Sequence, residues 1–419
     1  MHRSHALALA ARTSNIQPFY VMELMKHAHT LELQGRHIIH MSVGEPDFTA
    51  PQSVIDALAT AMQRGDTHYT AAVGILPLRR AIAQFLKARH GVDIDPARII
   101  ITAGASGALL LTMAALVDPG QEILMTDPSY PCNRHFVAAF DGIAKLIPSG
   151  PEHRFQLTSE MVDAHWTAAT RGVLIASPSN PTGTSIAPVE LRRIIDTVAA
   201  KKGITIVDEI YLELSYEDED ADEPADQYAG AGAGQIHHRS ALEFSDDVIV
   251  INSFSKYFHM TGWRLGWAVV PESLVPTFEK LAQNFFICAS TPAQYAALAC
   301  FEPETLAIYE ARKEEFKRRR DYIVPALRAI GFDVPVMPDG AFFVYANCSR
   351  FLTREIPDSN ALALHILDEA GVALVPGKDF GHHHPDRWVR LSYATSMENL
   401  REAVARIGQL LAAQKLSAA

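Results

Sequence analysis

A lysine stands among serines near the middle of the chain, a few residues before an arginine. Ser253-Phe254-Ser255-Lys256 follows an apolar run, and Arg264 comes shortly after it. An amine captures an aldehyde reversibly, whereas hydroxyls, backbone N–H groups and a guanidinium hold a phosphate. The grouping therefore predicts a site for an aldehyde cofactor that carries a phosphate. Taken alone, Lys256 could equally be a solvated loop lysine, so the prediction depends on the rest of the chain.

Short apolar runs rich in β-branched residues recur between residues 99 and 270, and segments with helical spacing separate them. This βαβ pattern predicts an α/β fold with a mainly parallel sheet covered by helices on both faces. The expected strands are Ile99 to Ile101, Glu122 to Met125, Val173 to Ala176, Ile204 to Val207, Val248 to Ile251 and Trp267 to Val270.

Polar residues follow five of these strands. They are Gly104 and Ser106, Asp127 and Tyr130, Asn180, Asp208 and Tyr211, and the segment from Ser253 to Lys256. Ligands of open α/β sheets bind beyond the carboxyl ends of the strands. We therefore expect these groups to meet at one edge of the sheet.

Pyridoxal phosphate is the cofactor that Lys256 suggests, and its ring requires particular partners. The pyridine nitrogen stays protonated beside a carboxylate, because a nearby opposite charge shifts a pKa by about 1–3 units, and Asp208 is the candidate. Tyr211 and Asn180 could donate to the phenolic oxygen, while Tyr130 could stack on the ring. Each also has a plainer interpretation: Asp208 as a helix cap, Asn180 as a turn residue and Tyr130 as a core residue.

Two further segments suit the ends of such a complex. The run from Thr102 to Leu109 passes from strand into helix through small residues, and a helix start offers unpaired N–H groups to a phosphate. In Val389 to Tyr393, the strand alternation points Arg390 and Ser392 away from the apolar face. A guanidinium grips a carboxylate bidentately, so Arg390 predicts an amino acid substrate, although it could also be an exposed strand residue.

Composition excludes several classes of protein. The chain has 419 residues, 48% of them hydrophobic, and a net charge of −11, which argues against nucleic acid or an anionic membrane as the main partner. We expect its one basic run, Lys317 to Arg320, to be the exposed face of a helix.

Four cysteines without CxxC spacing indicate neither zinc nor a disulfide framework. The apolar stretch Ala6 to Ala11 is too short to span a membrane, so we expect a cytoplasmic protein.

The pattern predicts two domains. A large domain is expected over residues 45–302, and a smaller α+β domain over residues 1–44 and 303–419. The smaller domain should contain helices at 305–330, 359–370 and 397–414 and strands at 341–345 and 389–393. The stretch from Tyr216 to Gly234 is acidic and then rich in Gly and Ala, which predicts a surface loop. His382 to His384 lack a carboxylate or cysteine partner at metal-ligand spacing, so no metal site is expected.

At this point the sequence resembles the class I/II aminotransferases of the aspartate aminotransferase superfamily, which are fold-type I pyridoxal-phosphate enzymes. The resemblance covers nearly the whole chain, and the order and spacing of its motifs are specific. The motifs are Gly44-Glu45-Pro46-Asp47-Phe48, Tyr69-Thr70 with Gly74 and Leu78-Arg79, Asn180-Pro181-Thr182-Gly183, Asp208-Glu209-Ile210-Tyr211, Ser253 to Lys256 with Gly262-Trp263-Arg264, Pro338 to Phe343, and Arg390-Leu391-Ser392.

The resemblance implies an L-amino acid donor, a 2-oxo acid acceptor and a ping-pong reaction in which Lys256 forms an aldimine with pyridoxal phosphate and then moves a proton. It implies that Asp208 binds the ring nitrogen, Tyr211 and Asn180 the phenolic oxygen, and that Tyr130 stacks on the ring. The implied phosphate ligands are Ala105, Ser106, Ser253, Ser255 and Arg264, with Tyr69 reaching from the second subunit of a homodimer. The implied ligands of the substrate carboxylate are Gly44, Asn180 and Arg390.

Two other functions share part of this pattern. A β-lyase or decarboxylase uses the same fold and lysine, and the outcome depends on which substrate bond lies perpendicular to the ring. A transcription regulator on this fold needs an N-terminal DNA-binding module, and the residues before Gly44 are too few for one. The sequence offers no arginine that can be assigned to a second substrate carboxylate, and it does not name the donor or the acceptor.

Overall fold

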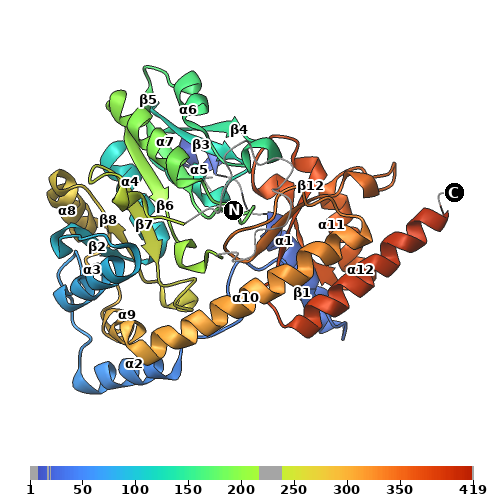
Figure 1. Cartoon of the computed structure of the whole chain (residues 1–419), viewed down its shortest axis with the longest axis horizontal. Coiled ribbons are helices and arrows are strands. Elements are labelled where there is room, and N and C mark those ends of the chain that lie inside the picture. The colour runs from blue at the N-terminus through green and yellow to red at the C-terminus, as the bar shows by residue number, and fades with distance from the viewer. Residues whose placement is uncertain (1–7, 17, 19, 217–237, 418–419) are drawn as a thin grey trace, which may run out of the picture.

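The structure is a computed structural model that describes residues 8–16, 18, 20–216 and 238–417. Nearly all of the acidic stretch expected to form a surface loop lies outside these residues. Tyr216, at its start, is buried, and its hydroxyl donates to the carbonyl oxygen of Ala341. The described chain folds around a seven-stranded sheet and, beside it, a three-stranded sheet with a separate pair of strands (Figure 1).

The larger sheet has seven strands in the order β2-β8-β7-β6-β5-β3-β4. The pairs among β3 to β7 are parallel, whereas β8 is antiparallel to both of its neighbours. The strands are β2 (Ile99–Thr102), β3 (Glu122–Asp127), β4 (Ile143–Pro148), β5 (Thr170–Ala176), β6 (Ile204–Asp208), β7 (Ile249–Ser253) and β8 (Gly266–Val269). The mainly parallel α/β sheet predicted from the sequence is confirmed.

Two strands of this sheet depart from the simple pattern. No α-helix separates β7 from β8, so β8 returns antiparallel beside β7. Strand β4 lies at the edge of the sheet, and only one of its six residues is fully buried. It therefore lacks the continuous apolar run by which the other strands were found in the sequence.

Buried residues form an apolar cluster on each face of the large sheet. Ile99 packs in one cluster and its neighbour Ile100 in the other, as strand alternation requires. Helices α4 and α8 pack on β2 and β8 on one face, while α7 packs on β6 within the other cluster. The helices of this part are α2 (Gln52–Arg64), α3 (Leu76–His90), α4 (Gly104–Leu116), α5 (Pro131–Ala138), α6 (Ser159–His165), α7 (Pro188–Ala200), α8 (Val275–Phe285) and α9 (Thr291–Ala296).

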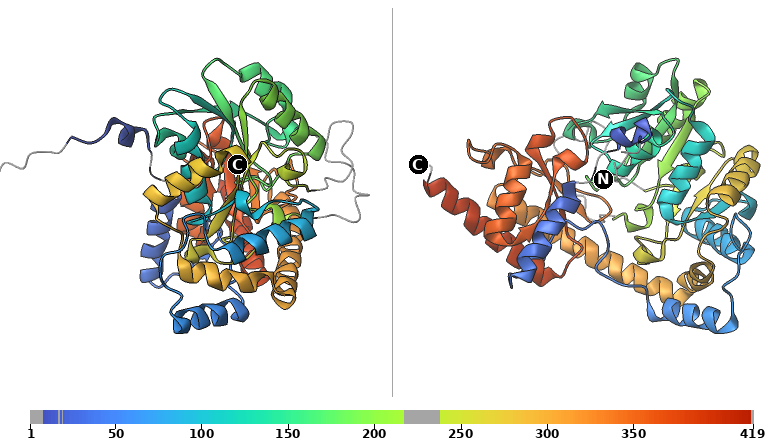
Figure 2. Two further views of the ribbon diagram at one scale, coloured as in Figure 1. Left: turned by 90° about the vertical axis from the view of Figure 1, so that its left-hand side faces the viewer. Right: turned by 180° about the vertical axis from the view of Figure 1, so that it is seen from behind.

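The second part of the structure holds an antiparallel sheet, β11-β12-β9, and a parallel pair, β1-β10. The strands are β1 (Ile39–His40), β9 (Phe343–Asn347), β10 (Val372–Ala373), β11 (Val375–Pro376) and β12 (Trp388–Ser392). Its helices are α1 (Tyr20–Leu33), α11 (Ser359–Ala370) and α12 (Met397–Ser417). Figure 2 shows α1, near the N-terminus, lying beside these C-terminal elements, and α1 contacts β10 and β11.

The long helix α10 (Pro303–Ile330) runs from the end of the molecule that holds α2 and α9 to the second sheet (Figure 1). The expectation of an exposed basic face on this helix is wrong for two of its arginines. Arg319 and Arg320 are buried: Arg319 pairs with Asp47 at 2.8 Å, and Arg320 donates to the carbonyl oxygen of Pro338 at 3.1 Å. Helical rotation turns these two side chains inward, where buried partners compensate their charge.

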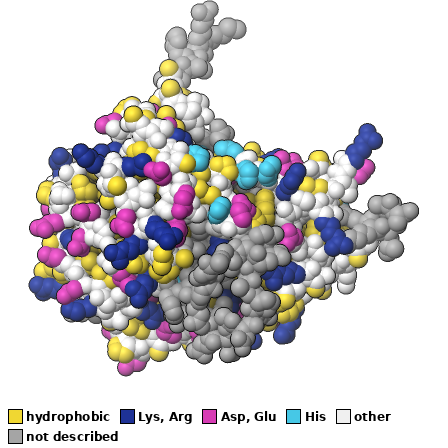
Figure 3. Space-filling view, turned by 45° about the horizontal axis from the view of Figure 1, so that its top comes forward, with side chains coloured by type: hydrophobic (Ala, Val, Ile, Leu, Met, Phe, Trp, Pro, Cys, Tyr) yellow, Lys and Arg dark blue, Asp and Glu magenta, His cyan; other side chains and the backbone are white. Residues whose placement is uncertain are grey.

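The surface mixes both signs of charge. On the face drawn in Figure 3, Lys and Arg side chains are interspersed with Asp and Glu side chains. Within the described ranges, no helix is both long and apolar enough to cross a membrane. In the same ranges, no group of three His, Cys, Asp or Glu side chains is arranged to hold a metal ion.

Candidate active site

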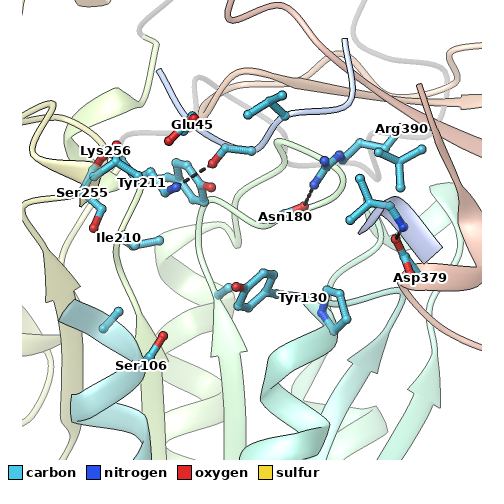
Figure 4. A pocket seen from close by; sticks show the side chains of 18 of the residues that line it. Glu45, Ser106, Tyr130, Asn180, Ile210, Tyr211, Ser255, Lys256, Asp379 and Arg390 are labelled. Carbon is cyan, nitrogen blue, oxygen red and sulfur yellow. Dashed lines mark hydrogen bonds between the residues drawn. The ribbon is translucent and has the colours of Figure 1, made fainter. Parts of the chain in front are cut away.

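A cavity of about 360 Å³ opens where the carboxyl ends of the parallel strands meet the second sheet (Figure 4). Its size is within the usual range for small-molecule sites. Eleven residues singled out from the sequence line it: Gly44, Ala105, Ser106, Tyr130, Asn180, Asp208, Tyr211, Ser255, Lys256, Arg264 and Arg390. The structure thus brings together groups that lie far apart along the chain.

Lys256 lies in the connection between β7 and β8, and its amine points into the cavity. Its Nζ donates to the carbonyl oxygen of Gly44 at 2.6 Å and lies 6.0 Å from the centre of the Tyr211 ring. The pKa of Lys256 is lowered to about 8, mainly by burial and also by the nearby Arg390, whereas Glu45 acts in the opposite direction. Roughly a tenth of this amine is therefore neutral at pH 7, and the neutral amine is the state that attacks an aldehyde.

Asp208 is the last residue of β6 and lines the cavity. It is 5% exposed, and its Oδ1 accepts the backbone N–H of Ile210 at 3.1 Å. Burial raises its pKa to about 6, although that hydrogen bond and the charge of Lys256 act in the opposite direction. This bond closes a local turn and does not cap a helix, since the 3-10 helix that follows begins at Leu212 with Tyr211 at its N-cap. Its second oxygen remains for a cationic partner, which would restore full ionisation.

The start of α4 and Arg264 form one end of the cavity. Gly104 begins α4 with φ +71°, and a Cβ built there would lie 2.6 Å from Arg264 Nη2. The guanidinium therefore lies against the first turn of the helix, where Ala105 and Ser106 carry unpaired N–H groups. Arg264 Nη1 also reaches Ser255 Oγ at 3.5 Å. The Arg264 guanidinium, the serine hydroxyls and the positive end of the α4 dipole therefore face one place, which is suited to a phosphate.

Two residues expected at this end lie elsewhere. Ser253 does not line the cavity: its hydroxyl accepts the N–H of Ser255 at 3.1 Å and donates to the carbonyl oxygen of Leu265 at 3.0 Å. It therefore holds the loop that carries Ser255. Tyr69 is 80% exposed on the surface of the described chain and also lies outside the cavity lining.

Arg390 occupies the opposite end of the cavity from Lys256 (Figure 4). It is buried on β12, with its Cζ 4.5 Å from the centre of the Phe343 ring and 4.9 Å from that of Phe380. Nη1 donates to Asn180 Oδ1 at 2.9 Å and Nη2 to the carbonyl oxygen of Ser42 at 2.6 Å. Nε has no partner among the described residues. A buried guanidinium with an unused donor is suited to a carboxylate ligand.

Tyr130 lies between the two ends of the cavity, with its ring directed into it (Figure 4). It immediately precedes α5, which fixes the direction of its side chain. Burial raises the pKa of its hydroxyl, as it does for Tyr211, so both phenols stay neutral donors. Neutral donors can stabilise a phenolate oxygen without neutralising it.

Several lining residues were not predicted from the sequence. They are Glu45, Asp379 and Phe380 near Lys256 or Arg390, and Val21 and Met25 of α1. Glu45 lies within a motif that was noted, so its charge was a usable signal. Asp379 and the α1 residues follow no predicted strand, and only the packing of the N-terminal helix brings them to the cavity.

These residues fit an aldehyde cofactor that carries a phosphate. The supporting observation is how closely the backbone of β8 approaches the start of α4. A Cβ on Gly266 would lie 2.7 Å from the Gly104 carbonyl carbon and 2.9 Å from the Ala105 nitrogen. Only glycine allows β8 to approach the start of α4 so closely. This approach leaves the first turn of α4 facing the cavity that also holds Lys256.

Comparisons with known proteins agree with this geometry. The family model described as aminotransferase class I and II matches residues 36–407. The chain is 37% identical over 404 residues to the valine–pyruvate aminotransferase of Mycobacterium tuberculosis, covering 96% of this chain and 99% of that protein. It is 32% identical over 415 residues to the aspartate aminotransferase of Geobacillus stearothermophilus, covering 97% and 100%.

Solved structures show the same similarity in three dimensions. A crystal structure of an aminotransferase from Mycobacterium tuberculosis superimposes with a TM-score of 0.89 at 36% identity, covering 97% of this chain and 100% of that one. The resemblance noted from the sequence motifs is therefore confirmed, and with it the fold. The chain belongs to the class I and II aminotransferases and is a transaminase that depends on pyridoxal 5'-phosphate.

Proposed function

We propose that Lys256 and Arg390 are the two working ends of this transaminase, with the amino acid held between them. The observation that carries the assignment is that a partly buried amine and a buried guanidinium face one cavity from opposite ends. Arg390 binds the carboxylate of the donor, with Asn180 and the backbone at Gly44 beside it. Lys256 is left to move the proton at the donor α-carbon.

The remaining lining residues hold the cofactor. Bound pyridoxal phosphate supplies an aldehyde that captures amino groups and a ring that withdraws electrons from the substrate α-carbon. Asp208 keeps the ring nitrogen protonated, Tyr211 and Asn180 donate to the phenolic oxygen, and Tyr130 stacks on the ring. The phosphate is held by Ala105, Ser106, Ser255 and Arg264, with Ser253 supporting Ser255.

We further propose that the active form is a homodimer in which Tyr69 completes the phosphate site of the partner. Its exposure of 80% supports this, because a tyrosine so exposed on one chain is available to a second copy. We also propose a large domain over residues 45–302 and a small one over residues 1–44 and 303–419, which the separation of the seven-stranded sheet from the smaller ones supports. We also propose a cytoplasmic location, which the four free cysteines support.

The residue assignments are tested by reducing the purified holoenzyme with borohydride and mapping the adduct by peptide mass spectrometry. We expect the cofactor on residue 256. Single amino acids added to the unreduced enzyme should change the cofactor absorbance, and a 2-oxo acid should reverse the change with formation of a new amino acid. An adduct on another amine would overturn the role of Lys256, and release of ammonia without amino transfer would point to a lyase.

The dimer is tested by mixing two inactive variants, Tyr69→Ala and Lys256→Ala. A hybrid dimer contains one site with both native residues, so random reassortment should recover about a quarter of the wild-type activity. Native mass spectrometry of the mixture, with one variant isotope-labelled, measures the subunit exchange directly. If subunits exchange but activity does not recover, Tyr69 belongs to the active site of its own subunit.

A further inference from the structure

Helix α1 forms one wall of the active-site cavity. Val21 and Met25 lie one turn apart on the same face and line the cavity, whereas Leu24 and Ala28 are buried in the core. Val21 packs in a cluster that also contains Val375 and Phe380, two further cavity residues. The helix therefore presents an apolar edge to the place where substrate binds.

Asp379 holds the beginning of this helix. Its Oδ1 accepts the backbone N–H of Tyr20 at 2.7 Å, and its Oδ2 accepts that of Val21 at 2.9 Å. Arg134 Nη2 fixes the position of Asp379 by donating to its carbonyl oxygen at 2.9 Å. A carboxylate that accepts the first N–H groups of a helix stabilises that helix end. Asp379 also lines the cavity, on the same side as Arg390 (Figure 4).

The part of the cavity left for a substrate side chain offers no cation. Among the lining residues that the structure describes, the cations are Lys256, Arg264 and Arg390. Each already has a role toward the amino group, the phosphate or the α-carboxylate. The charged lining residues without a cofactor or substrate role are Glu45 and Asp379, and both are acids that would repel a second carboxylate.

The proposed site fixes the positions of two substituents of the donor α-carbon. The carboxylate binds Arg390, and the amino group points toward Lys256. The side chain must then occupy the remaining space, which the apolar edge of α1 borders. We propose that α1 is the side-chain wall, that Asp379 is the positioning residue which holds it there, and that the donors are L-amino acids with apolar side chains rather than dicarboxylic ones. This inference rests on the proposed roles of Lys256 and Arg390.

The donor class is tested with the holoenzyme and a series of straight-chain donors, alanine, 2-aminobutyrate and norvaline, against aspartate and glutamate. Each methylene buried against the wall should raise kcat/KM about fourfold, so norvaline should exceed alanine by roughly 15-fold. Aspartate and glutamate should be poorer donors than norvaline. A preference for aspartate or glutamate would overturn the inference, because a cation from the partner subunit would then complete the pocket.

The role of Asp379 is tested with Asp379→Ala, which removes both acceptors for the α1 amides. The norvaline-to-alanine ratio should fall from about 15-fold to about two- to fourfold. Hydrogen exchange of the first turn of α1 should become faster in the same variant. A ratio that stays at the wild-type value would show that the position of the helix does not depend on Asp379.

Thr158→Ala is the control, because Thr158 caps another helix, α6, by accepting the N–H of Met161 at 3.2 Å. It lies outside the cavity lining and should leave the norvaline-to-alanine ratio unchanged. Met25→Ser provides a second test that keeps the cap and should also lower the ratio. Leu33→Ser, at an exposed site on the same helix, is its control.

Failure of this inference can be told apart from failure of the proposed function. If aspartate is preferred while the borohydride adduct still maps to Lys256, the wall assignment is wrong and the roles of the two working ends stand. If no donor transfers its amino group and the adduct maps elsewhere, the proposed function itself fails. If Asp379→Ala lowers kcat/KM equally for alanine and norvaline, the assignment of α1 as the side-chain wall is also wrong.

Discussion

Arg390 and Asn180 form a hydrogen bond of 2.9 Å across the boundary between the two sheets. Arg390 comes from β12 of the smaller sheet, whereas Asn180 lies in the loop after β5 of the larger one. Neither part of the molecule therefore contains the proposed carboxylate site by itself. The packing of Arg390 between Phe343 and Phe380 holds the guanidinium in place before any ligand arrives.

Replacing Arg390 should mainly weaken transition-state binding of the donor carboxylate. Arg390→Met keeps the apolar packing but removes two charge-assisted hydrogen bonds, each worth about 1.5–3 kcal/mol, so kcat/KM should fall by roughly 10²–10⁴. Cofactor absorbance should stay near that of the wild type. Arg387→Met, at an exposed position three residues earlier, is the control and should change little. A loss below tenfold would remove Arg390 from the carboxylate site.

The uptake of pyridoxal phosphate by the cofactor-free protein should depend on pH through Lys256. The neutral amine is the attacking form, and its pKa is about 8, so the uptake rate should rise with pH and level off above that value. Glu45 raises the pKa of Lys256, so Glu45→Gln should move the midpoint to lower pH. Stopped-flow absorbance gives the profiles. An upward shift would contradict the electrostatic role of Glu45.

A methyl group at the start of α4 should disturb the phosphate end selectively. Gly104→Ala forces a Cβ toward Arg264 Nη2, 2.6 Å away, at a residue with φ +71°. We expect cofactor affinity to fall by about tenfold or more, as one charge-assisted bond is lost. Gly107→Ala lies one turn later, where the nearest atom is 3.4 Å away, and should bind the cofactor normally. Fluorescence titration measures the cofactor affinity of both variants. Equal affinities would argue against a phosphate site at the start of α4.

Glu209 should make the cofactor-free protein less stable as pH rises. It is buried beside Asp208, and burial raises its pKa to about 7 from 4.5. The folded state therefore holds this proton more tightly than the unfolded chain, so the stability that Glu209 contributes is lost between about pH 4.5 and 7, by up to about 3 kcal/mol.

Glu209→Gln stays neutral throughout this range and isolates that contribution. Urea unfolding should give similar stabilities for the two proteins near pH 4.5 and a more stable variant at pH 8. The charge of Glu209 raises the pKa of His90, so the difference between the two proteins reports Glu209 together with its coupling to His90. A variant that is less stable at pH 8 would show that the hydrogen bonds from Ser240 and Ala241 need the charge.

Much of the site followed from the sequence because of how parallel strands are arranged. Asp208 and Lys256 each lie at or just after a strand with a continuous apolar run, and parallel strands end at one edge. Local pattern was therefore sufficient to place them together. Strand β4, with its half-buried edge position, carried too weak a pattern to be found.

The sequence by itself determined the α/β sheet, the lysine and serines after β7 and the arginine on β12, because periodicity and residue chemistry are local properties. Only the tertiary structure decided that Asp379 caps α1, that Arg319 and Arg320 turn inward and that Val21 and Met25 face the cavity. These contacts join residues up to 359 positions apart, and nothing in either local sequence specifies its distant partner. They depend on the docking of whole elements, which burial of the shared apolar core drives.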